Sequence, residues 1–333
     1  MTEAESADRF YKNKLVFIVM KQEEPILVAI HCLVYNHEPY LRDCFEGFVM
    51  QKTNFRFVAI VHEDCSTDHS ADIIREYEAK YPDIFRPIYE SENQYSKHDG
   101  SLGRIMNAAI DATGAKYVAM CEGDDYWTDS YKLQKQVDFL ESHPVFSMCC
   151  HGADVRNETL RKVDCECEKM TTREYFANDA FPTWQIPTAS IVYRRDIVDS
   201  YPVKNAKNFM AGDVVLILKC MHVGRVWGMA EHMSVYRMNQ GGATSQSLDM
   251  NGQLRLCQHY EALIQNFPKI NPDYCHRYIA MTHYTNFRQS KKFKIKIKSL
   301  WMAFKHMPTY VLRKVLKLKT KPRKDLFYQY YGQ

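Results

Sequence analysis

The sequence predicts an α/β fold in which a mostly parallel, Rossmann-like sheet is flanked by helices on both faces. Short apolar segments alternate with segments of helical spacing over residues 26–150, which is the pattern of strands joined by helical crossovers. The apolar segments are nearly continuous, as in strands that are buried on both faces. The 333 residues are 46% hydrophobic and 25% charged, which is enough apolar material for one large α/β domain with an appendage.

The elements of the first half follow in order. Residues 26–34 are an apolar run typical of a buried strand, and residues 38–50 place Leu41, Phe45 and Phe48 on one helical stripe. The same alternation predicts further strands at 55–61, 84–89 and 116–121, and helices at 68–80, 101–112 and 130–142.

The second half is less regular. Glu174 stands in capping-box position from Thr171, which predicts a short helix over 171–177. The Lys-x-Lys-x-Lys alternation at 292–298 is not cleanly helical, whereas basic and apolar faces separate at helical spacing over 299–318. The remaining predicted elements are strands at 188–194 and 225–237, and helices at 213–222, 250–267 and 273–287.

Positive charge is concentrated near the end of the sequence. The net charge is +4, but residues 288–324 hold 14 Lys or Arg and no Asp or Glu, which leaves 30 bases against 40 acids elsewhere. Residues 291–320 mix these lysines with Leu, Ile, Phe and Trp301, which suits an anionic membrane surface. A solvated helix pair with a basic face is the alternative. Nucleic-acid binding is disfavoured because the rest of the chain is acidic.

The cysteines and the absence of long apolar runs predict a cytoplasmic protein with reduced thiols. The eleven cysteines form no Cys-x-x-Cys pair, and the sequence shows no secretory signal. No apolar run reaches the ~18–20 residues that cross a bilayer. Residues 1–19 fit no element well, and Met20 is an alternative start. We therefore interpret residues 1–24 as an N-terminal extension.

Polar residues follow three of the predicted strands. They are Tyr35-Asn36-His37 after the first, Glu63-Asp64-Cys65-Ser66-Thr67-Asp68 after the second, and Glu122-Gly123-Asp124-Asp125 after the strand at 116–121. Parallel sheets bind ligands outside the carboxyl ends of their strands, so these segments are expected to meet at one edge. Three carboxylates within four residues repel one another, and a divalent cation with oxygen ligands relieves that repulsion. A solvated acidic turn that caps the following helix is the alternative.

These three motifs, in this order, resemble the nucleotide-binding half of a family 2 glycosyltransferase with a GT-A fold. That family has a strand ending in Thr-Tyr-Asn, a strand ending in Asp-Asp-Gly-Ser-Thr-Asp, and a later Asp-x-Asp-Asp. Here Val34, Glu63, Cys65 and Glu122 replace the family's Thr, Asp, Gly and first motif Asp. The sequence Glu122-Gly-Asp-Asp-Tyr-Trp127 is similar to a form found in bacterial surface-polysaccharide transferases.

The resemblance implies roles at the donor site. Tyr35 stacks on the nucleobase and Asp64 bonds its edge, while Glu122 contacts ribose or metal. Asp124 ligates a Mn²⁺ or Mg²⁺ ion that bridges the diphosphate, with Glu122 as the second candidate ligand. The full set of expected nucleotide-sugar-binding residues is Tyr35, Asn36, Glu63, Asp64, Arg104, Glu122, Gly123 and Arg237.

The resemblance also implies a catalytic base in the second half. Gly212-Asp213 precedes an apolar helical segment at the place where the family carries this carboxylate, although a helix cap is the alternative for Asp213. Arg237 is expected to neutralise the diphosphate, or else to form a structural ion pair. Residues 184–195, beginning at Trp184, are expected to line the acceptor site, although Trp184 also fits a core position.

The predicted organisation is a GT-A domain over 25–245 followed by a helical, basic region over 246–333. Residues 25–130 form the nucleotide-sugar-binding half and residues 131–245 the acceptor half. The implied function is inverting transfer of a sugar, most simply from a UDP-sugar, to a hydroxyl of a saccharide or lipid-linked acceptor. The alternatives are a non-catalytic nucleotide-sugar-binding protein at the membrane and a sugar nucleotidyltransferase.

Overall fold

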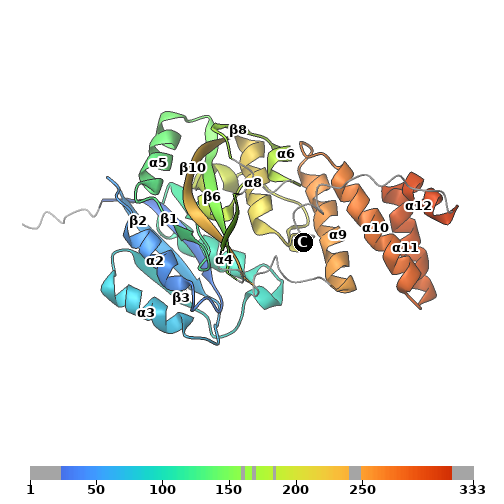
Figure 1. The fold of residues 1–333 in the computed structure, drawn as a ribbon, viewed down its shortest axis with the longest axis horizontal. Helices are drawn as coiled ribbons and strands as arrows, with labels where there is room; N and C mark the ends of the chain where they lie inside the picture. The colour runs from blue at the N-terminus through green and yellow to red at the C-terminus, as the bar shows by residue number, and fades with distance from the viewer. Residues whose placement is uncertain (1–23, 159–161, 167–169, 183–184, 240–248, 317–333) are drawn as a thin grey trace, which may run out of the picture.

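The computed structural model describes residues 24–158, 162–166, 170–182, 185–239 and 249–316 (Figure 1). Within these residues, ten strands form one sheet to which two groups of helices attach. The predicted N-terminal extension and Trp184 lie outside the described residues, apart from Glu24.

The first half of the sheet is parallel, as predicted. Its strands are β1 (Ile26–Val34), β2 (Arg56–Glu63), β3 (Phe85–Tyr89) and β4 (Tyr117–Met120), in the spatial order β3-β2-β1-β4. The register aligns Val34 at the end of β1 with Glu63 at the end of β2. Adjacent parallel strands therefore end together, which brings the polar segments that follow them to one edge.

The second half of the sheet mixes directions. The order continues from β4 through β9 (Val192–Arg194), β6 (Phe146–Asn157) and β10 (Arg225–Met238) to β5 (Tyr126–Trp127). β10 runs parallel to β6, whereas β9 is antiparallel to both of its neighbours. β7 (Lys162–Glu166) and β8 (Arg173–Tyr175) pair with β6 and β10 outside this path.

Helices cover both faces of the sheet because successive residues of the central strands are buried on opposite sides. Val28 and Ile30 of β1 pack in the same cluster as the helices α2 (Leu41–Val49), α3 (Ser70–Lys80) and α5 (Lys132–Ser142). Ala29 faces the other cluster, which holds apolar residues of α4 (Ser101–Asp111) and α8 (Gly212–Val223). This alternation is the period-2 pattern of a strand buried on both sides.

The C-terminal helices extend the molecule away from the sheet. In Figure 1, α9 (Met250–Asn266) and α10 (Asp273–Gln289) stand beside the α8 side of the sheet. The helices α11 (Phe293–His306) and α12 (Pro308–Val315) lie beyond them and form the far end. No helix of the described residues is long and apolar enough to span a membrane.

The predicted helix at 171–177 is wrong. Residues 173–175 form β8, which pairs antiparallel with β10, and a short helix α6 (Ala177–Ala180) follows. The ring of Tyr175 lies against Gly228, where a Cβ would come within 2.4 Å of it. Glu174 forms an ion pair with Arg225 instead of closing a capping box. Long-range strand pairing therefore outweighs the local capping pattern.

Residues 292–298, whose lysine alternation is not cleanly helical, nevertheless fall almost entirely in a regular helix, since α11 begins at Phe293. Only a narrow side of this helix is buried, at Ser299 and Ala303. The alternating lysines therefore remain largely in water on a regular helix, and their alternation carries no strand signal. At 188–194, a 3₁₀ turn (Thr188–Ser190) precedes the short strand β9.

Candidate active site

Loops that follow β1 and β2 are tied together at the polar edge of the sheet. The backbone N–H of Asn36 donates to Ser66 Oγ over 3.0 Å, and the Asn36 side chain accepts from the backbone N–H of Thr67 over 2.7 Å. The backbone N–H of Gly123 donates to the Leu33 carbonyl over 3.0 Å, which brings the third motif to the same edge. The three polar segments predicted to meet are therefore adjacent.

Cys65 occupies a backbone conformation that glycine adopts without cost. Its φ is +61°, in the left-handed region, where a side chain is sterically disfavoured. The turn after β2 therefore has a backbone conformation that favours glycine, which is the residue that Cys65 replaces in the expected motif.

The carboxylates of Glu63 and Asp64 are both buried and both accept backbone N–H groups. Glu63 accepts from Ser66 over 2.6 Å, within its own turn. Asp64 accepts from Gln94 over 2.6 Å and from Tyr95 over 3.0 Å, which anchors the segment after β3. The predicted contact of Asp64 with a nucleobase stays a prediction. Beside this site Tyr35 is 45% exposed, and its predicted stacking on a nucleobase stays a prediction.

Asp124 and Asp125 lie in a turn that is fixed from the other half of the chain. Asp125 is buried, and its carboxylate accepts the backbone N–H of Arg237 over 2.8 Å. Burial, together with the charge of Asp124, raises the pKa of Asp125 well above its usual value. Asp124 accepts from Asn239 Nδ2 over 2.9 Å and lies 3.9 Å from His37 Nε2.

The Arg237 side chain holds the same turn. Its Nη1 donates to the backbone carbonyl of Asp124 over 3.0 Å, its Nε donates to Glu158 over 2.9 Å, and its Nη2 pairs with Asp43. The guanidinium also lies 4.3 Å from the Tyr126 ring centroid. The residue is 3% exposed. The structural ion pair weighed for Arg237 is therefore present, and its contact with a diphosphate stays a prediction.

Glu122 and Asp213 come close enough to interact electrostatically. Burial, then the charge of Asp124, then that of Asp213 raise the pKa of Glu122 to about 8. Asp213 lies in the first turn of α8, and Thr188 Oγ1 donates to its carboxylate over 3.4 Å. Burial raises the pKa of Asp213 as well. Carboxylates from segments some 90 residues apart in the sequence thus share one site.

The donor set fits a hard divalent cation only in part. Among the described residues, no group of three or more His, Cys, Asp or Glu is arranged to hold a metal ion. Asp124 and Glu122 nevertheless supply oxygen donors in a site where burial, and then the neighbouring carboxylates, raise the Glu122 pKa. One or two carboxylates suffice for Mg²⁺ when phosphate oxygens and water complete its coordination. The residues present are therefore compatible with a metal that arrives with a diphosphate.

The two remaining predicted residues, Gly123 and Arg104, differ in how tightly they are packed. Gly123 is packed tightly between the loops: a Cβ there would lie 2.8 Å from His37 Nδ1 and 2.9 Å from Val34 Cγ2. Arg104 is exposed on the first turns of α4, where its Nη1 donates to the Asp99 carbonyl over 2.9 Å. A role for Arg104 in donor binding stays a prediction.

Sequence reasoning missed the supports of the site. Asp43 and Glu158 carry no motif, because their partner Arg237 is distant in the sequence, whereas His37 belongs to the predicted polar segment after β1. Asp43 is separated from Arg237 by 194 residues and Glu158 by 79. In the structure Glu158 follows the end of β6, as the other polar residues of the site follow their strands, but the sequence pattern predicted no strand there.

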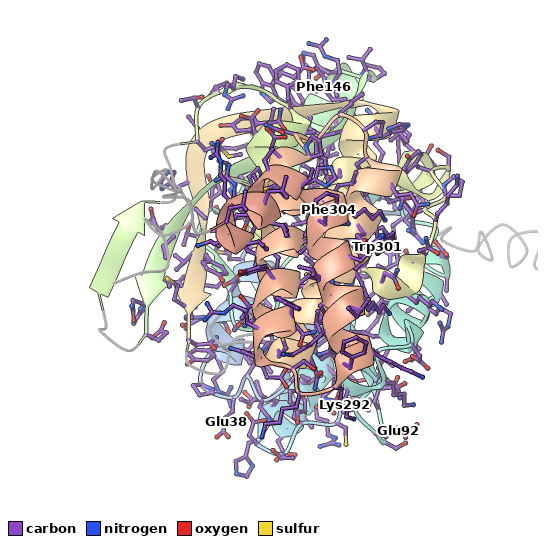
Figure 2. The ribbon with its side chains drawn as sticks, turned by 90° about the vertical axis from the view of Figure 1, so that its right-hand side faces the viewer. Glu38, Glu92, Phe146, Lys292, Trp301 and Phe304 are labelled. Atoms are coloured by element: carbon purple, nitrogen blue, oxygen red, sulfur yellow. The ribbon has the colours of Figure 1, made fainter. Side chains whose placement is uncertain are left out.

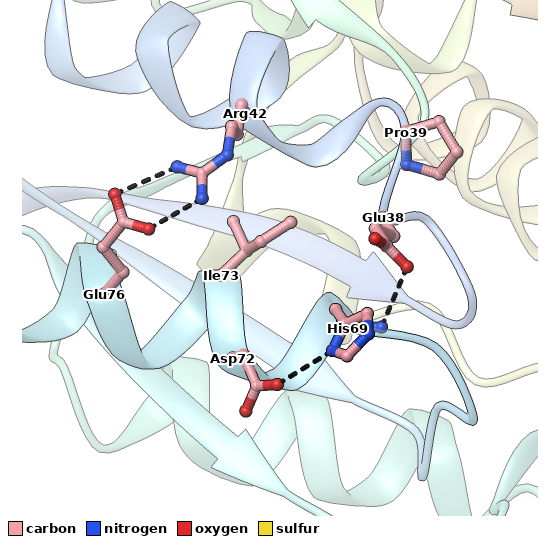
Figure 3. A pocket seen from close by; sticks show the side chains of 7 residues that line it. All are labelled: Glu38, Pro39, Arg42, His69, Asp72, Ile73 and Glu76. Carbon is pink, nitrogen blue, oxygen red and sulfur yellow. Dashed lines mark hydrogen bonds and ion pairs between the residues drawn. The ribbon is translucent and has the colours of Figure 1, made fainter.

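A separate open hollow of about 480 Å³ lies between α2 and α3 (Figure 3). Its charged side chains already pair with each other. Arg42 forms two bonds with Glu76, of 3.0 and 2.7 Å, and His69 lies 3.2 Å from Asp72. We assign no ligand to it.

Comparison with known proteins identifies the class that this fold and site define. Residues 30–201 match the family model described as glycosyl transferase family 2, and the chain belongs to this family. The resemblance inferred from the three motifs is thereby confirmed, and so is the GT-A fold class.

The relatives include uncharacterized proteins and putative glycosyltransferases. The chain is 36% identical over 219 residues to the uncharacterized protein Rv1520 of Mycobacterium tuberculosis, a match covering 65% of this chain and 60% of Rv1520. It is 26% identical over 222 residues to the putative teichuronic acid biosynthesis glycosyltransferase TuaG of Bacillus subtilis, covering 66% and 82%. The chain thus spans only about three fifths of the length of Rv1520.

Two solved structures share the fold. TarS residues 1–349 of S. aureus, in complex with UDP-GlcNAc, superpose with a TM-score of 0.56 at 16% identity, covering 86% of this chain and 83% of that one. The mannosyltransferase PcManGT of Pyrobaculum calidifontis, with GDP-Man and Mn²⁺, gives 0.50 at 12% identity, covering 93% and 94%.

Proposed function

We propose that the chain is an inverting, metal-dependent glycosyltransferase that moves a sugar from a nucleotide diphosphate-sugar to an acceptor hydroxyl. The observation that carries this proposal is the meeting of the three polar segments at one edge of the sheet, where burial and then the charges of Asp124 and Asp213 raise the pKa of Glu122. A solvated acidic turn would not hold Asp125 buried against the backbone of Arg237, nor place Glu122 where the charge of Asp213 reaches it. Such a cluster favours a cation and a proton acceptor in one site.

Asp213 is the proposed base. An inverting transfer needs a carboxylate that takes the proton of the acceptor hydroxyl as its oxygen attacks the anomeric carbon. Burial raises the pKa of Asp213, which makes the carboxylate a better proton acceptor than an exposed one. The bond from Thr188 orients it at the start of α8. Residues 185–195, the described part of the predicted acceptor segment, include Thr188 and so lie next to this base.

The donor is proposed to lie across the ends of β1, β2 and β4. Tyr35 stacks on the base, and Asp64 contacts the edge of the base after exchanging one of its backbone partners. Glu122 and Asp124 hold the diphosphate end, where a bound Mn²⁺ or Mg²⁺ would stabilise the departing diphosphate. Asn36, Glu63 and Gly123 shape the turns that bring these side chains together.

The relatives support a role in surface polysaccharide synthesis. TuaG is named for teichuronic acid biosynthesis, and TarS was solved with UDP-GlcNAc. We therefore propose a UDP-sugar donor and a saccharide or lipid-linked acceptor. PcManGT was solved with Mn²⁺, which favours Mn²⁺ as the first ion to test. We further propose a cytoplasmic location, supported by the free thiols of the described cysteines, and contact with the inner face of a membrane.

The proposal is tested by thermal stabilisation with UDP in the presence and absence of Mn²⁺, followed by a screen of donor hydrolysis across nucleotide sugars. We expect UDP to raise the melting temperature substantially more with Mn²⁺ than with a chelator. Asp124→Asn should lose that difference, whereas Asp138→Asn, at an exposed position on α5, should keep it. Equal stabilisation with and without Mn²⁺ would count against the metal. Stabilisation without turnover of any donor would favour the binding protein.

A further inference from the structure

Helix α11 is packed on one side and open on the other. Its inner side faces α10, where Asn286 Nδ2 donates to Ser299 Oγ over 3.0 Å and where Ala303 is fully buried. At its end, His306 contacts His276 of α10, with 2.9 Å between their Nδ1 atoms. These contacts fix the rotation of α11 about its own axis, and they therefore determine which of its sides faces solvent.

The open side of α11 carries large apolar residues. Phe293, Ile297, Trp301 and Phe304 follow one another at helical spacings of four, four and three residues, so they form one stripe. They are 76%, 52%, 59% and 46% exposed. Figure 2, which looks onto this end of the molecule, shows Trp301 and Phe304 as neighbours on α11. A single exposed apolar side chain is ordinary, but a stripe of four is not.

A row of lysines runs beside this stripe. Lys294, Lys298 and Lys305 each stand one position after a member of the stripe, and all three are exposed. The Lys305 ammonium lies 5.6 Å from the Trp301 ring centroid. The next helix repeats the combination: α12 exposes Leu312 and Val315, with Arg313 and Lys314 between them.

We propose that this outer face of α11 and α12 binds the surface of an anionic lipid bilayer. Its residues are Phe293, Lys294, Ile297, Lys298, Trp301, Phe304, Lys305, Leu312, Arg313, Lys314 and Val315. The apolar stripe enters the boundary between headgroups and acyl chains, while the lysines reach the lipid phosphates with their long stems. Tryptophan favours that same boundary.

The charge pattern favours an anionic bilayer over two other partners, a second copy of the chain and a nucleic acid. No Asp or Glu occurs between residues 288 and 324, so a second copy of the same face would bring like charges together. A nucleic acid would accept the lysines but would leave the aliphatic residues Ile297, Leu312 and Val315 in water. An anionic bilayer offers both an apolar boundary and negative charge. The inference does not depend on the proposed chemistry.

The test is co-sedimentation of the full chain with vesicles of phosphatidylcholine alone, or with a third of that lipid replaced by phosphatidylglycerol. We expect binding to the anionic vesicles that is at least about tenfold stronger than to the neutral ones and that weakens as salt is added. Lys294→Glu with Lys298→Glu should weaken binding by more than about 25-fold, since each basic residue contributes about fivefold. Trp301→Ala with Phe304→Ala should weaken it at any salt concentration.

The controls are matched for side-chain type and exposure. Phe176 is 61% exposed on the sheet domain, and Lys207 is exposed before α8, so Phe176→Ala and Lys207→Glu should bind vesicles like the unaltered chain. Equal loss in the control and test variants would overturn the proposal, as would equal binding to neutral and anionic vesicles. The face would instead be assigned to a second copy if the chain forms a dimer in solution, does not bind vesicles, and becomes monomeric when Trp301→Ala is combined with Phe304→Ala. Circular dichroism of each variant confirms that it folds.

Discussion

The backbone N–H of Arg237 donates to the Asp125 carboxylate over 2.8 Å, although 112 residues separate them. The Arg237 side chain then bonds the carbonyl of Asp124. One residue of β10 thus fixes the turn that presents the candidate metal ligand Asp124. The two halves of the sheet are joined at the point where the donor diphosphate is proposed to lie.

Replacing Arg237 should loosen this turn. We expect Arg237→Ala to lower the free energy of unfolding by about 3 kcal/mol, because it breaks a buried charged network, and to weaken Mn²⁺-dependent binding of UDP by about 10- to 100-fold. Arg237→Lys should reduce stability and UDP binding nearly as much, because an ammonium cannot reproduce three directed bonds. Isothermal titration with UDP and Mn²⁺ measures the effect. Full binding by Arg237→Lys would mean that Arg237 acts through its charge on the diphosphate.

Gly123 should tolerate no side chain. A Cβ would press on His37, Val34 and Leu41 at 2.8 to 3.1 Å, so Gly123→Ala should cost about 1–3 kcal/mol of stability and displace Asp124. Gly103 on α4 has no atom within 4 Å of a built Cβ, and Gly103→Ala should leave stability unchanged or raise it slightly. Urea unfolding of both variants makes the comparison. Equal stability of the two would contradict the tight packing of the motif.

Tyr35 should contribute to nucleotide affinity without supporting the fold. Its ring is 45% exposed, so Tyr35→Ala should change stability little. Loss of base stacking should weaken UDP binding by about 1–3 kcal/mol, and Tyr35→Phe should retain most of it. Titration calorimetry with UDP tests both variants. Unchanged affinity in Tyr35→Ala would remove this residue from the donor site.

A buried lysine next to the site should make stability depend on pH. Lys132 is fully buried, with its ammonium 4.2 Å from the Trp127 ring centroid and bonded to Gln136 over 2.8 Å. Burial lowers its pKa to about 7. Between pH 7 and the ordinary lysine pKa, the unfolded chain therefore binds more protons than the folded one, and stability rises with pH.

Lys132→Met should abolish that rise. In the unaltered chain, the group contributes up to about 1.4 kcal/mol of unfolding free energy per pH unit above pH 7. The free energy of unfolding of the variant, relative to that of the unaltered chain, should therefore be highest at pH 6 and lowest at pH 9. Urea unfolding at these pH values checks the trend. Parallel pH curves for the two chains would show that Lys132 is not a low-pKa group.

Much of the fold and the centre of the site could be predicted because their signals are local. The strands β1, β2 and β4 are buried on both faces, so each is a continuous apolar run that ends where its polar segment begins. The strand β8 could not be predicted, since it depends on the space that Gly228 leaves for Tyr175, 53 positions earlier. The helical start of α11 was hidden because the alternation of lysine with apolar residues over 292–298 obscures the helical spacing of Phe293 and Ile297.

The supports of the site were equally hidden. Arg237 could be identified as a candidate from its motif, but its bonds to Asp43 and Glu158 depend on how three separate segments of the chain pack together. The pKa of Glu122 likewise depends on Asp213, which only the folded chain brings near. Sequence patterns identify the residues that carry chemistry more readily than those that hold them in place.

The most direct test of the central claim is the turnover of Asp213→Asn with the donor that the hydrolysis screen identifies. Asp213 is proposed to take the acceptor proton, so the variant should lose about 10²- to 10⁴-fold in kcat while its affinity for UDP and Mn²⁺ stays within about twofold. Asp72→Asn, an exposed first-turn aspartate on α3, serves as the matched control and should keep full turnover. Undiminished kcat in Asp213→Asn would show that the cluster of Glu122, Asp124 and Asp213 is not a catalytic site.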